Sequence, residues 1–270
     1  HLGHAYSAML AHDMALADGG AFLLRIEDID RARSKQAWEA LIYEDLAWLG
    51  LSWPGPVMRQ SDRRPAYGAA LDALWDRGLL YPCSCTRRDI AEALSAPQEG
   101  AAPAVGPDGP VYPGTCRATA PRAGARPAGC HLRLDMERAI ARLDGPPGFE
   151  ETGTTHAGRI VTAPDRYPAE IGDIVLARRD MGTSYHLSVV LDDAAQGITH
   201  VTRGADLFEA TRIHVLLQRL LGLPTPVYHH HRLIRDADGK RLAKRDDARA
   251  IRTCRAAGTT PADLRQKLGL

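Results

Sequence analysis

A short apolar segment followed at once by acidic residues is the feature that most constrains the fold of this chain. Residues 21–26 (Ala-Phe-Leu-Leu-Arg-Ile) have the length and character of a buried strand, and Glu27 and Asp28 come directly after it. Helical patterns occupy 4–17 and 34–49 on either side. Because strands that alternate with helices form parallel sheets, whose ligands bind at the carboxyl ends of the strands, the sequence predicts an α/β fold with a site near Glu27.

Local signals predict the remaining elements. Gly19-Gly20 ends the first helix, and Ser34 is expected to cap the second, whose apolar face is formed by Trp38, Leu41, Leu46 and Leu49. Further helices are expected at 65–75, at 86–94 behind a Thr86/Asp89 capping box, at 210–221 before Gly222, and from Thr260-Pro261 onward. Strands are expected at 131–135, 173–178 and 186–191, the last two around a hairpin-like turn at 180–183.

Composition limits the class of protein. The 270 residues carry 34 basic and 33 acidic side chains, so contacts with nucleic acid must come from a local patch rather than from bulk charge. No apolar run is long enough to span a bilayer. The count of five cysteines is odd, and Cys83 and Cys85 are too close for an easy structural disulfide, which favours the reducing cytoplasm.

Residues 95–129 are rich in Ala, Pro and Gly, and cannot form a packed helix or strand throughout. Because ordered patterning returns after Cys130, this stretch is interpreted as an insertion rather than a linker.

Two short segments are suited to bind phosphate. His1 and His4 share one face of the first helical turn, where the helix N-terminus adds partial positive charge. Lys240, Arg241, Lys244 and Arg245 follow a turn-forming Asp-Ala-Asp-Gly, and such a loop can neutralise charge on ATP. The alternatives are terminal histidines without a role and a solvated basic loop, or one that touches RNA phosphate.

Five segments together resemble a known family. They are His1-Leu2-Gly3-His4, 22–30 (FLLRIEDID), 187–193 (LSVVLDD), 197–207 (GITHVTRGADL) and 240–245 (KRLAKR). In this order they resemble the class I aminoacyl-tRNA synthetases of the glutamyl branch. The resemblance implies a Rossmann-like parallel sheet with an inserted zinc-containing subdomain and a small C-terminal helical subdomain. Its implied boundaries are 1–82 and 185–230 for the halves of the catalytic core, 83–184 for the insertion, and 231–270 for the signature loop and helices.

The same resemblance implies roles for individual residues. Glu27 corresponds to the acid that contacts the amino group of glutamate, and Tyr185 and Arg203 to residues that line the glutamate pocket. An arginine suits a bidentate contact with a carboxylate, and Asp206 is expected to help hold the site. His1, His4 and Lys244 are expected to bind ATP and to act in catalysis. The plainer alternatives are a surface ion pair for Glu27 and a core hairpin position for Tyr185.

The chain departs from the family pattern in two places. Arg241 and Ala243 stand where the family has a lysine and a serine, so lysine geometry and a hydroxyl are lost. The family also places a strand and a turn, with an arginine and a serine that bind glutamate, before the first histidine. Since a sheet without that strand would leave backbone groups unpaired, we expect further residues before His1.

Cys83, Cys85 and Cys116 predict a metal site. Two thiolates from one tight turn and a third from a second turn supply three tetrahedral zinc ligands. The fourth ligand implied by the resemblance is the phenolate of Tyr112, with Cys130 as a substitute. Such a structural clip would hold a stretch that cannot pack by itself. The alternative is three free thiols.

The short segment after Lys244 bears on the acceptor. Full glutamyl-tRNA synthetases carry a large C-terminal region that reads the anticodon, whereas the chain resembles the glutamyl-Q tRNA(Asp) synthetases, which correspond to the catalytic half. That resemblance implies activation of L-glutamate by ATP, with Mg²⁺, and transfer to queuosine at the wobble base of tRNA(Asp), by a cytoplasmic monomer. Phosphates of the anticodon stem-loop would meet Arg232, Arg235, Arg249, Arg252 and Arg255. The alternatives are a catalytic fragment that charges tRNA(Glu) and a non-catalytic RNA-binding paralogue.

Overall fold

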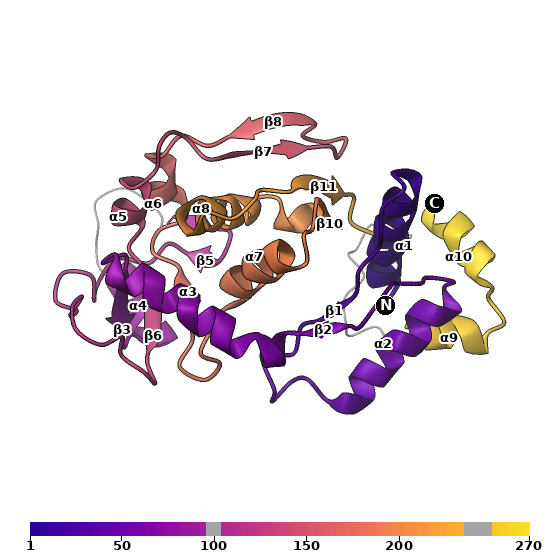
Figure 1. Ribbon diagram of the computed structural model, residues 1–270, viewed down its shortest axis with the longest axis horizontal. Helices are drawn as coiled ribbons and strands as arrows, with labels where there is room; N and C mark the ends of the chain where they lie inside the picture. Colours follow the sequence, from indigo (N-terminus) through magenta and orange to yellow (C-terminus); the bar gives the residue numbers. More distant parts are fainter. Residues whose placement is uncertain (96–103, 235–249) are drawn as a thin grey trace.

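The structure is a computed structural model that describes residues 1–95, 104–234 and 250–270 (Figure 1). Its α-helices are α1 Leu2–Ala17, α2 Gln36–Trp48, α3 Arg64–Asp76, α4 Arg87–Ser95, α5 Met136–Ile140, α6 Arg166–Glu170, α7 Tyr185–Ala195, α8 Thr211–Leu221, α9 Ile251–Ala256 and α10 Pro261–Leu268. Two short 3₁₀ helices are η1 Gln60–Arg63 and η2 Ala205–Leu207. None of the helices in these ranges is long and apolar enough to cross a bilayer.

The described strands form four small sheets. They are β1 Arg25–Ile26, β2 Met58–Arg59, β3 Leu80–Cys83, β4 Val105–Gly106, β5 Gly109–Pro110, β6 His131–Leu134, β7 Gly148–Glu151, β8 Gly158–Val161, β9 Val175–Ala177, β10 His200–Gly204 and β11 Val227–His231. The order is β10-β11-β7-β8 in the largest sheet, β3-β6-β9 in an antiparallel sheet, and β1-β2 and β4-β5 in two pairs.

The predicted parallel α/β architecture is confirmed. Strands β10, β11 and β7 run parallel, with Arg203 opposite His230, and β1 pairs with β2 in parallel. The carboxyl ends of β10, β11 and β7 therefore meet at one edge and bring Arg203, His230 and Glu151 into one region. Strand β7 belongs to the segment 83–184, in which we expected the insertion, yet it pairs with β11.

Two apolar cores hold these layers together. The larger one joins α3, α7 and α8 to the β3-β6-β9 sheet, with Leu134, Leu187 and Leu216 completely buried. The second joins α1 to the end of the chain, where Met9 and Leu264 are fully buried. Figure 1 shows α9 and α10 beside α1 and α2. Each fully buried leucine contributes about 1.5–3 kcal/mol relative to exposure, so both cores are substantial.

The strand predicted at 186–191 is wrong, because this segment lies in helix α7. Ser184 caps α7 by accepting a hydrogen bond from the Leu187 backbone N–H at 3.4 Å. The helix is buried on most sides, so its sequence is an almost continuous apolar run, and periodicity alone cannot distinguish such a run from a buried strand. The turn at 180–183 accordingly leads from strand β9 into a helix rather than forming a hairpin.

Two features of the N-terminal region also differ from expectation. Helix α2 begins after Lys35 with no side-chain cap, so Ser34 does not cap it, and no residue of α2 is buried. The predicted apolar face is divided: Trp38 is 53% exposed and lines a cavity with Leu41, whereas Leu46 and Leu49 pack in the second core. Strand β1 is also shorter than the predicted 21–26, since only Arg25 and Ile26 pair with β2.

Other local predictions are confirmed. The Thr86/Asp89 capping box forms in both directions, and the Thr260/Asp263 pair caps α10 in the same way. Helix α8 ends at Gly222, whose φ of 66° places it in the left-handed region that glycine adopts without strain.

Candidate active site and metal centre

A buried arginine surrounded by neutral acceptors lies at the carboxyl edge of the parallel sheet. Arg203 of β10 is 8% exposed. Its Nη1 contacts His214 Nδ1 at 2.9 Å, its Nε donates to His230 Nε2 at 3.2 Å, and its Nη2 donates to Thr211 Oγ1. Within residues 1–95, 104–234 and 250–270, no carboxylate forms an ion pair with Arg203. Because a buried guanidinium without a counter-charge is unfavourable, this site favours a ligand that supplies a carboxylate.

Tyr185 lies within electrostatic reach of both this arginine and Glu27. Tyr185 begins α7, and its ring centroid is 5.6 Å from that of His214. Burial raises the pKa of the Tyr185 phenol, the Arg203 charge opposes this shift, and Glu27 adds to it. Glu27 follows β1 and contacts Arg25 Nη2 at 3.2 Å. The structure therefore places all three predicted glutamate-binding residues around one region, with Glu27 the most exposed of them.

Arg25 connects that region to helix α7. Its Nη1 contacts Asp193 Oδ1 at 2.6 Å, although Asp193 lies near the opposite end of α7 from Tyr185. Burial raises the pKa of the Asp193 carboxyl, and the Arg25 charge opposes that shift. Arg25 thereby holds the start of the Glu27 segment against α7. Asp206 lies in η2 after β10, with its Oδ1 against the backbone of Gly204.

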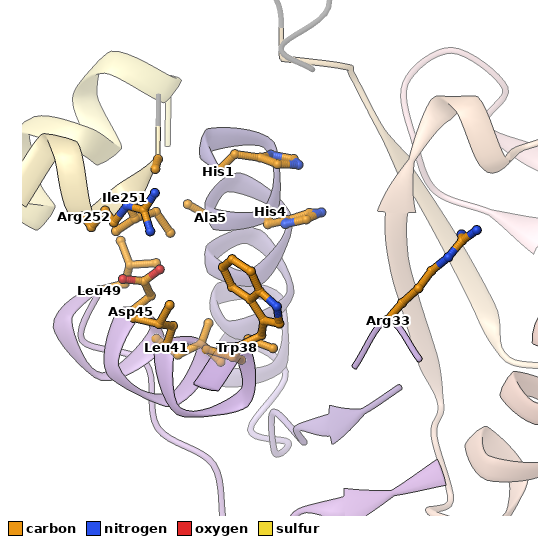
Figure 2. Close-up of a pocket in the computed structure, with 13 residues that line it drawn as sticks. His1, His4, Ala5, Arg33, Trp38, Leu41, Asp45, Leu49, Ile251 and Arg252 are labelled. Carbon is orange, nitrogen blue, oxygen red and sulfur yellow. The ribbon is translucent and has the colours of Figure 1, made fainter. Parts of the chain in front are cut away.

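The predicted phosphate-binding histidines flank a cavity. The rings of His1 and His4 stack with centroids 3.7 Å apart and planes inclined by 26°. They line a cavity of about 630 Å³ with Arg33, Trp38 and Arg252 (Figure 2). Figure 2 shows Arg33 set apart from the histidines of α1, with its side chain extending away from them in this view. Lys244 and the loop 240–245 lie outside the described residues, so the two-sided ATP site stays a prediction.

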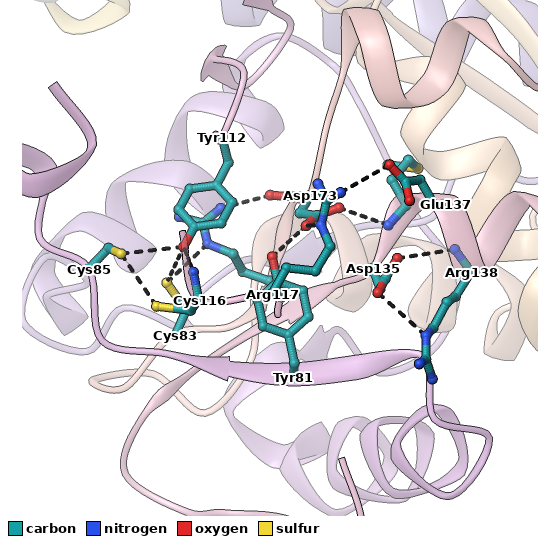
Figure 3. Close-up of polar contacts among 12 residues, drawn as sticks. Tyr81, Cys83, Cys85, Tyr112, Cys116, Arg117, Asp135, Glu137, Arg138 and Asp173 are labelled. Atoms are coloured by element: carbon teal, nitrogen blue, oxygen red, sulfur yellow. Dashed lines mark hydrogen bonds and ion pairs between the residues drawn. The ribbon is translucent and has the colours of Figure 1, made fainter. Parts of the chain in front are cut away.

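Three sulfur atoms gather at the start of the insertion. The ligand atoms of Cys83, Cys85 and Cys116 all lie within 4.8 Å of one another. Tyr112 Oη is 3.5 Å from Cys83 Sγ and 3.3 Å from Cys85 Sγ (Figure 3). A tetrahedral ion with bonds of about 2.3 Å to sulfur separates its sulfurs by about 3.8 Å, so this donor set fits zinc. Cys130 is not part of the cluster, because its thiol points to the Pro127 carbonyl at 4.0 Å.

Two arginines support the cysteine cluster. Arg133 of β6 donates to Cys83 Sγ at 3.3 Å and lies 3.8 Å over the ring of Tyr112, which places a positive charge beside groups that would bind a metal as anions. Arg117, next to Cys116, contacts the buried Asp173 at 2.7 Å. Asp173 also accepts from Tyr81, as Figure 3 shows, so the cluster is fixed to the β3-β6-β9 sheet.

The thiols differ in acidity. Burial raises the pKa of Cys85 to about 11. Burial also acts to raise the pKa of Cys116, but hydrogen bonds from Tyr112 and the Ser84 backbone outweigh it and lower the pKa to about 6. The lowered pKa favours the thiolate form of Cys116, which is the form that binds metals.

Sequence reasoning missed most of the groups around Arg203. His186, Thr211, His214, His230 and Glu151 all contact this site, directly or through one neighbour. The available signal was three consecutive histidines, 229–231, at the end of a strand. It also missed the buried carboxylate of Asp192, which accepts from Tyr67 Oη at 2.6 Å, Gln60 Nε2 at 3.0 Å and Arg63 Nε at 3.1 Å.

Comparison with known proteins identifies relatives over the whole chain. The family described as tRNA synthetases class I (E and Q), catalytic domain, matches residues 1–270. The glutamyl-Q tRNA(Asp) synthetase of Rhodobacter capsulatus is 64% identical over an alignment of 271 residues, which covers 100% of this chain and 95% of that protein. The protein of the same name from Nocardia farcinica is 42% identical over 280 residues, with 100% and 81% covered.

Solved structures show the same fold. A glutamate tRNA ligase from Elizabethkingia meningosepticum, in complex with its amino acid, has a TM-score of 0.69 and 26% identity over 91% of this chain. A glutamate-tRNA synthetase from Elizabethkingia anophelis has a TM-score of 0.70 at the same identity and coverage. The chain spans 49% and 50% of those two proteins, about half of each.

Proposed function

Because the chain belongs to the class I tRNA synthetases of the E and Q type, which are ATP-dependent ligases, we propose that it activates L-glutamate and transfers it to queuosine at the wobble position of tRNA(Asp). The observation that carries the proposal is the 64% identity, over the full chain, to a protein named for this reaction. The buried, carboxylate-free Arg203 supports the choice of an acidic amino acid.

In the first proposed step, glutamate reacts with ATP. An oxygen of its α-carboxylate attacks the α-phosphorus, the bond from that phosphorus to the bridging oxygen breaks, and pyrophosphate leaves. Arg203 and Tyr185 hold the side-chain carboxylate, and Glu27 holds the ammonium group. His1, His4 and Lys244 stabilise the charge that develops on the phosphates, with Mg²⁺ bound to ATP as part of the substrate.

In the second proposed step, a hydroxyl of queuosine attacks the carbonyl carbon of the mixed anhydride. The ester bond forms, the carbonyl carbon–oxygen bond to phosphate breaks, and AMP leaves, while the hydroxyl proton passes to the departing phosphate or to water. Because the anhydride is reactive, correct orientation of the hydroxyl supplies much of the acceleration.

We also propose that the cysteine cluster holds one structural zinc ion. Cys83, Cys85 and Cys116 would bind it with Tyr112 as the fourth ligand, and the ion would join residues that otherwise share only a small apolar cluster. It has no proposed part in the reaction.

The RNA-binding surface and the assembly state stay proposals. Of the five arginines expected at RNA phosphate, Arg232 donates to the Leu268 carbonyl and Arg255 contacts Glu44 at 2.8 Å, so both have protein partners. Arg235 and Arg249 lie outside the described residues. We propose a cytoplasmic monomer that binds the anticodon stem-loop of tRNA(Asp).

Pyrophosphate exchange tests the activation step. The wild-type chain should catalyse glutamate-dependent exchange between ATP and pyrophosphate without tRNA. Glu27→Gln should lower kcat/KM for glutamate by about 100-fold, because this substitution removes the negative charge opposite the ammonium group of glutamate. Asp18→Asn, at an exposed site after α1, is the control. Exchange by Glu27→Gln at the wild-type rate would refute the role of Glu27, and no exchange by the wild type would favour the non-catalytic alternative.

A further inference from the structure

The arginine at the centre of the site belongs to a hydrogen-bonded chain. It runs from His186 through His214 and Arg203 to His230 and Glu151, and Asp108 lies beyond its first member, 3.5 Å from His186 Nε2. We infer that His214 and His230 are positioning residues that orient Arg203 without neutralising it, and thereby set the preference for a carboxylate over an amide ligand. This inference rests on the proposed role of Arg203 in binding the side chain of glutamate.

Arg203 fixes the protonation of both imidazoles. A guanidinium only donates, so the two nitrogens that face it, His214 Nδ1 and His230 Nε2, must be acceptors. Each neutral ring therefore carries its proton on the other nitrogen. His214 Nε2 then donates to His186 Nδ1 at 3.0 Å, and His230 Nδ1 donates to Glu151 Oε2 at 2.5 Å.

The arm through His230 is rigid. Glu151 Oε1 accepts the backbone N–H of Gly153 at 2.6 Å and that of His230 at 2.9 Å, so its carboxylate cannot swing toward Arg203. A side chain at position 153 would collide with the His230 carbonyl, which leaves glycine as the residue that fits. Thr211 completes the arrangement by accepting from Arg203 and donating to the Leu207 carbonyl at 3.2 Å.

The side of the hydrogen-bonded chain that runs through His214 and His186 leads to the segment 83–184, where the insertion is expected. His186 Nε2, which carries the proton in this chain, faces Asp108 Oδ1 at 3.5 Å. Asp108 lies in the turn between β4 and β5, and this hairpin packs so closely on the Glu170 carbonyl that no side chain fits at Gly106. The carboxylate at this end is separated from Arg203 by two imidazoles.

This arrangement has a chemical consequence. Both of these carboxylates are kept at least one ring away from the guanidinium, so neither Asp108 nor Glu151 binds Arg203 directly. Burial lowers the pKa of His214 well below its usual value and also lowers that of His230, which keeps both rings neutral. A carboxylate ligand gains a charge-assisted hydrogen bond at this position, whereas an amide ligand gains a weaker one.

Matched substitutions at the two histidines test the inference. In His214→Asn the amide oxygen takes the place of Nδ1 and still accepts from Arg203, whereas His214→Leu keeps the bulk and loses the acceptor. In His230→Gln the amide oxygen takes the place of Nε2, whereas His230→Asn reaches only the Nδ1 position. His200→Ala is the control, because His200 is an exposed histidine of β10, the strand that carries Arg203. The readouts are the glutamate Kd by calorimetry, the KM values for ATP and glutamate, and the ratio of kcat/KM for glutamate to that for glutamine.

We expect His214→Leu and His230→Asn to weaken glutamate binding and to lower the glutamate-to-glutamine ratio of kcat/KM by about 10- to 100-fold. Losses of this size are typical when a residue that orients a metal ligand is removed. The KM for ATP should not change. His214→Asn and His230→Gln should recover most of both losses. An unchanged ratio in His214→Leu, or equal losses within each pair, would overturn the inference. A wild-type chain that binds glutamate but does not label queuosine would overturn only the proposed acceptor, and one that binds no glutamate would overturn both proposals.

Discussion

At the scale of single residues, the site is defined by which charges are paired and which are not. Arg25 has two acidic neighbours and Asp192 has three donors, so both are satisfied within the protein. Arg203 is the contrast, because its described partners are neutral. Sequence reasoning assigned roles to Arg203 and Tyr185 from the family resemblance, since Arg203 lies within the segment 197–207 and Tyr185 lies two residues before the segment 187–193. It could not identify Glu151 or His214, since their roles arise only when parallel strands and α8 bring distant positions together.

The buried histidines predict how stability depends on pH. Burial lowers the pKa of His214 and His230 in the folded state, so between their folded and unfolded pKa values the unfolded chain binds more protons. The free energy of unfolding should therefore fall as the pH drops below about 6.5, by up to about 1.4 kcal/mol per pH unit for each histidine. Urea unfolding at pH 7.5 and 5.5 measures this loss. His214→Asn should show a smaller loss, and a loss equal to that of the wild type would contradict the assignment.

At the scale of elements, predictions were confirmed where a local signal marks the element and were wrong where only tertiary packing decides. Helix α7 was predicted as a strand because burial on most sides erases helical periodicity, and only tertiary packing decides between the two. Helices α8 and α10 were predicted correctly because Gly222 and the Thr260-Pro261 pair are local signals that need no tertiary context. The cysteine turns were likewise readable from spacing, but the supporting Arg133 and Asp173 were not.

The cysteine cluster predicts a metal-dependent element. The purified chain should contain one zinc ion, Cys116→Ser should lose it, and Cys130→Ser should keep it, because Cys130 lies outside the cluster. Removal of the metal by a chelator should lower the Tm of the wild type and leave that of Cys116→Ser unchanged. Elemental analysis and calorimetry measure both effects. Equal zinc content in the two serine variants would show that the cluster does not hold the ion.

At the scale of the whole molecule, one chain combines a proposed amino-acid site, a cavity that we propose binds the nucleotide, and a candidate metal clip. Arg203, Tyr185 and Glu27 lie around the carboxyl edge of the parallel strands, the cavity beside His1 and His4 lies between α1 and α2, and the clip lies at the start of the insertion. The fold followed from the alternation of helices and strands, whereas the identity of the acceptor does not follow from the fold. The proposed acceptor rests on relatives named glutamyl-Q tRNA(Asp) synthetase, which match the whole of this chain.

Transfer of labelled glutamate tests that proposal most directly. The chain is incubated with ATP, labelled glutamate and one of three RNAs: tRNA(Asp) containing queuosine, the same tRNA without it, and tRNA(Glu). The account predicts label on the first RNA alone, and retention of the label after removal of the tRNA 3′ end, since the ester lies in the anticodon. Equal labelling of both forms of tRNA(Asp), or labelling of tRNA(Glu) alone, would contradict it.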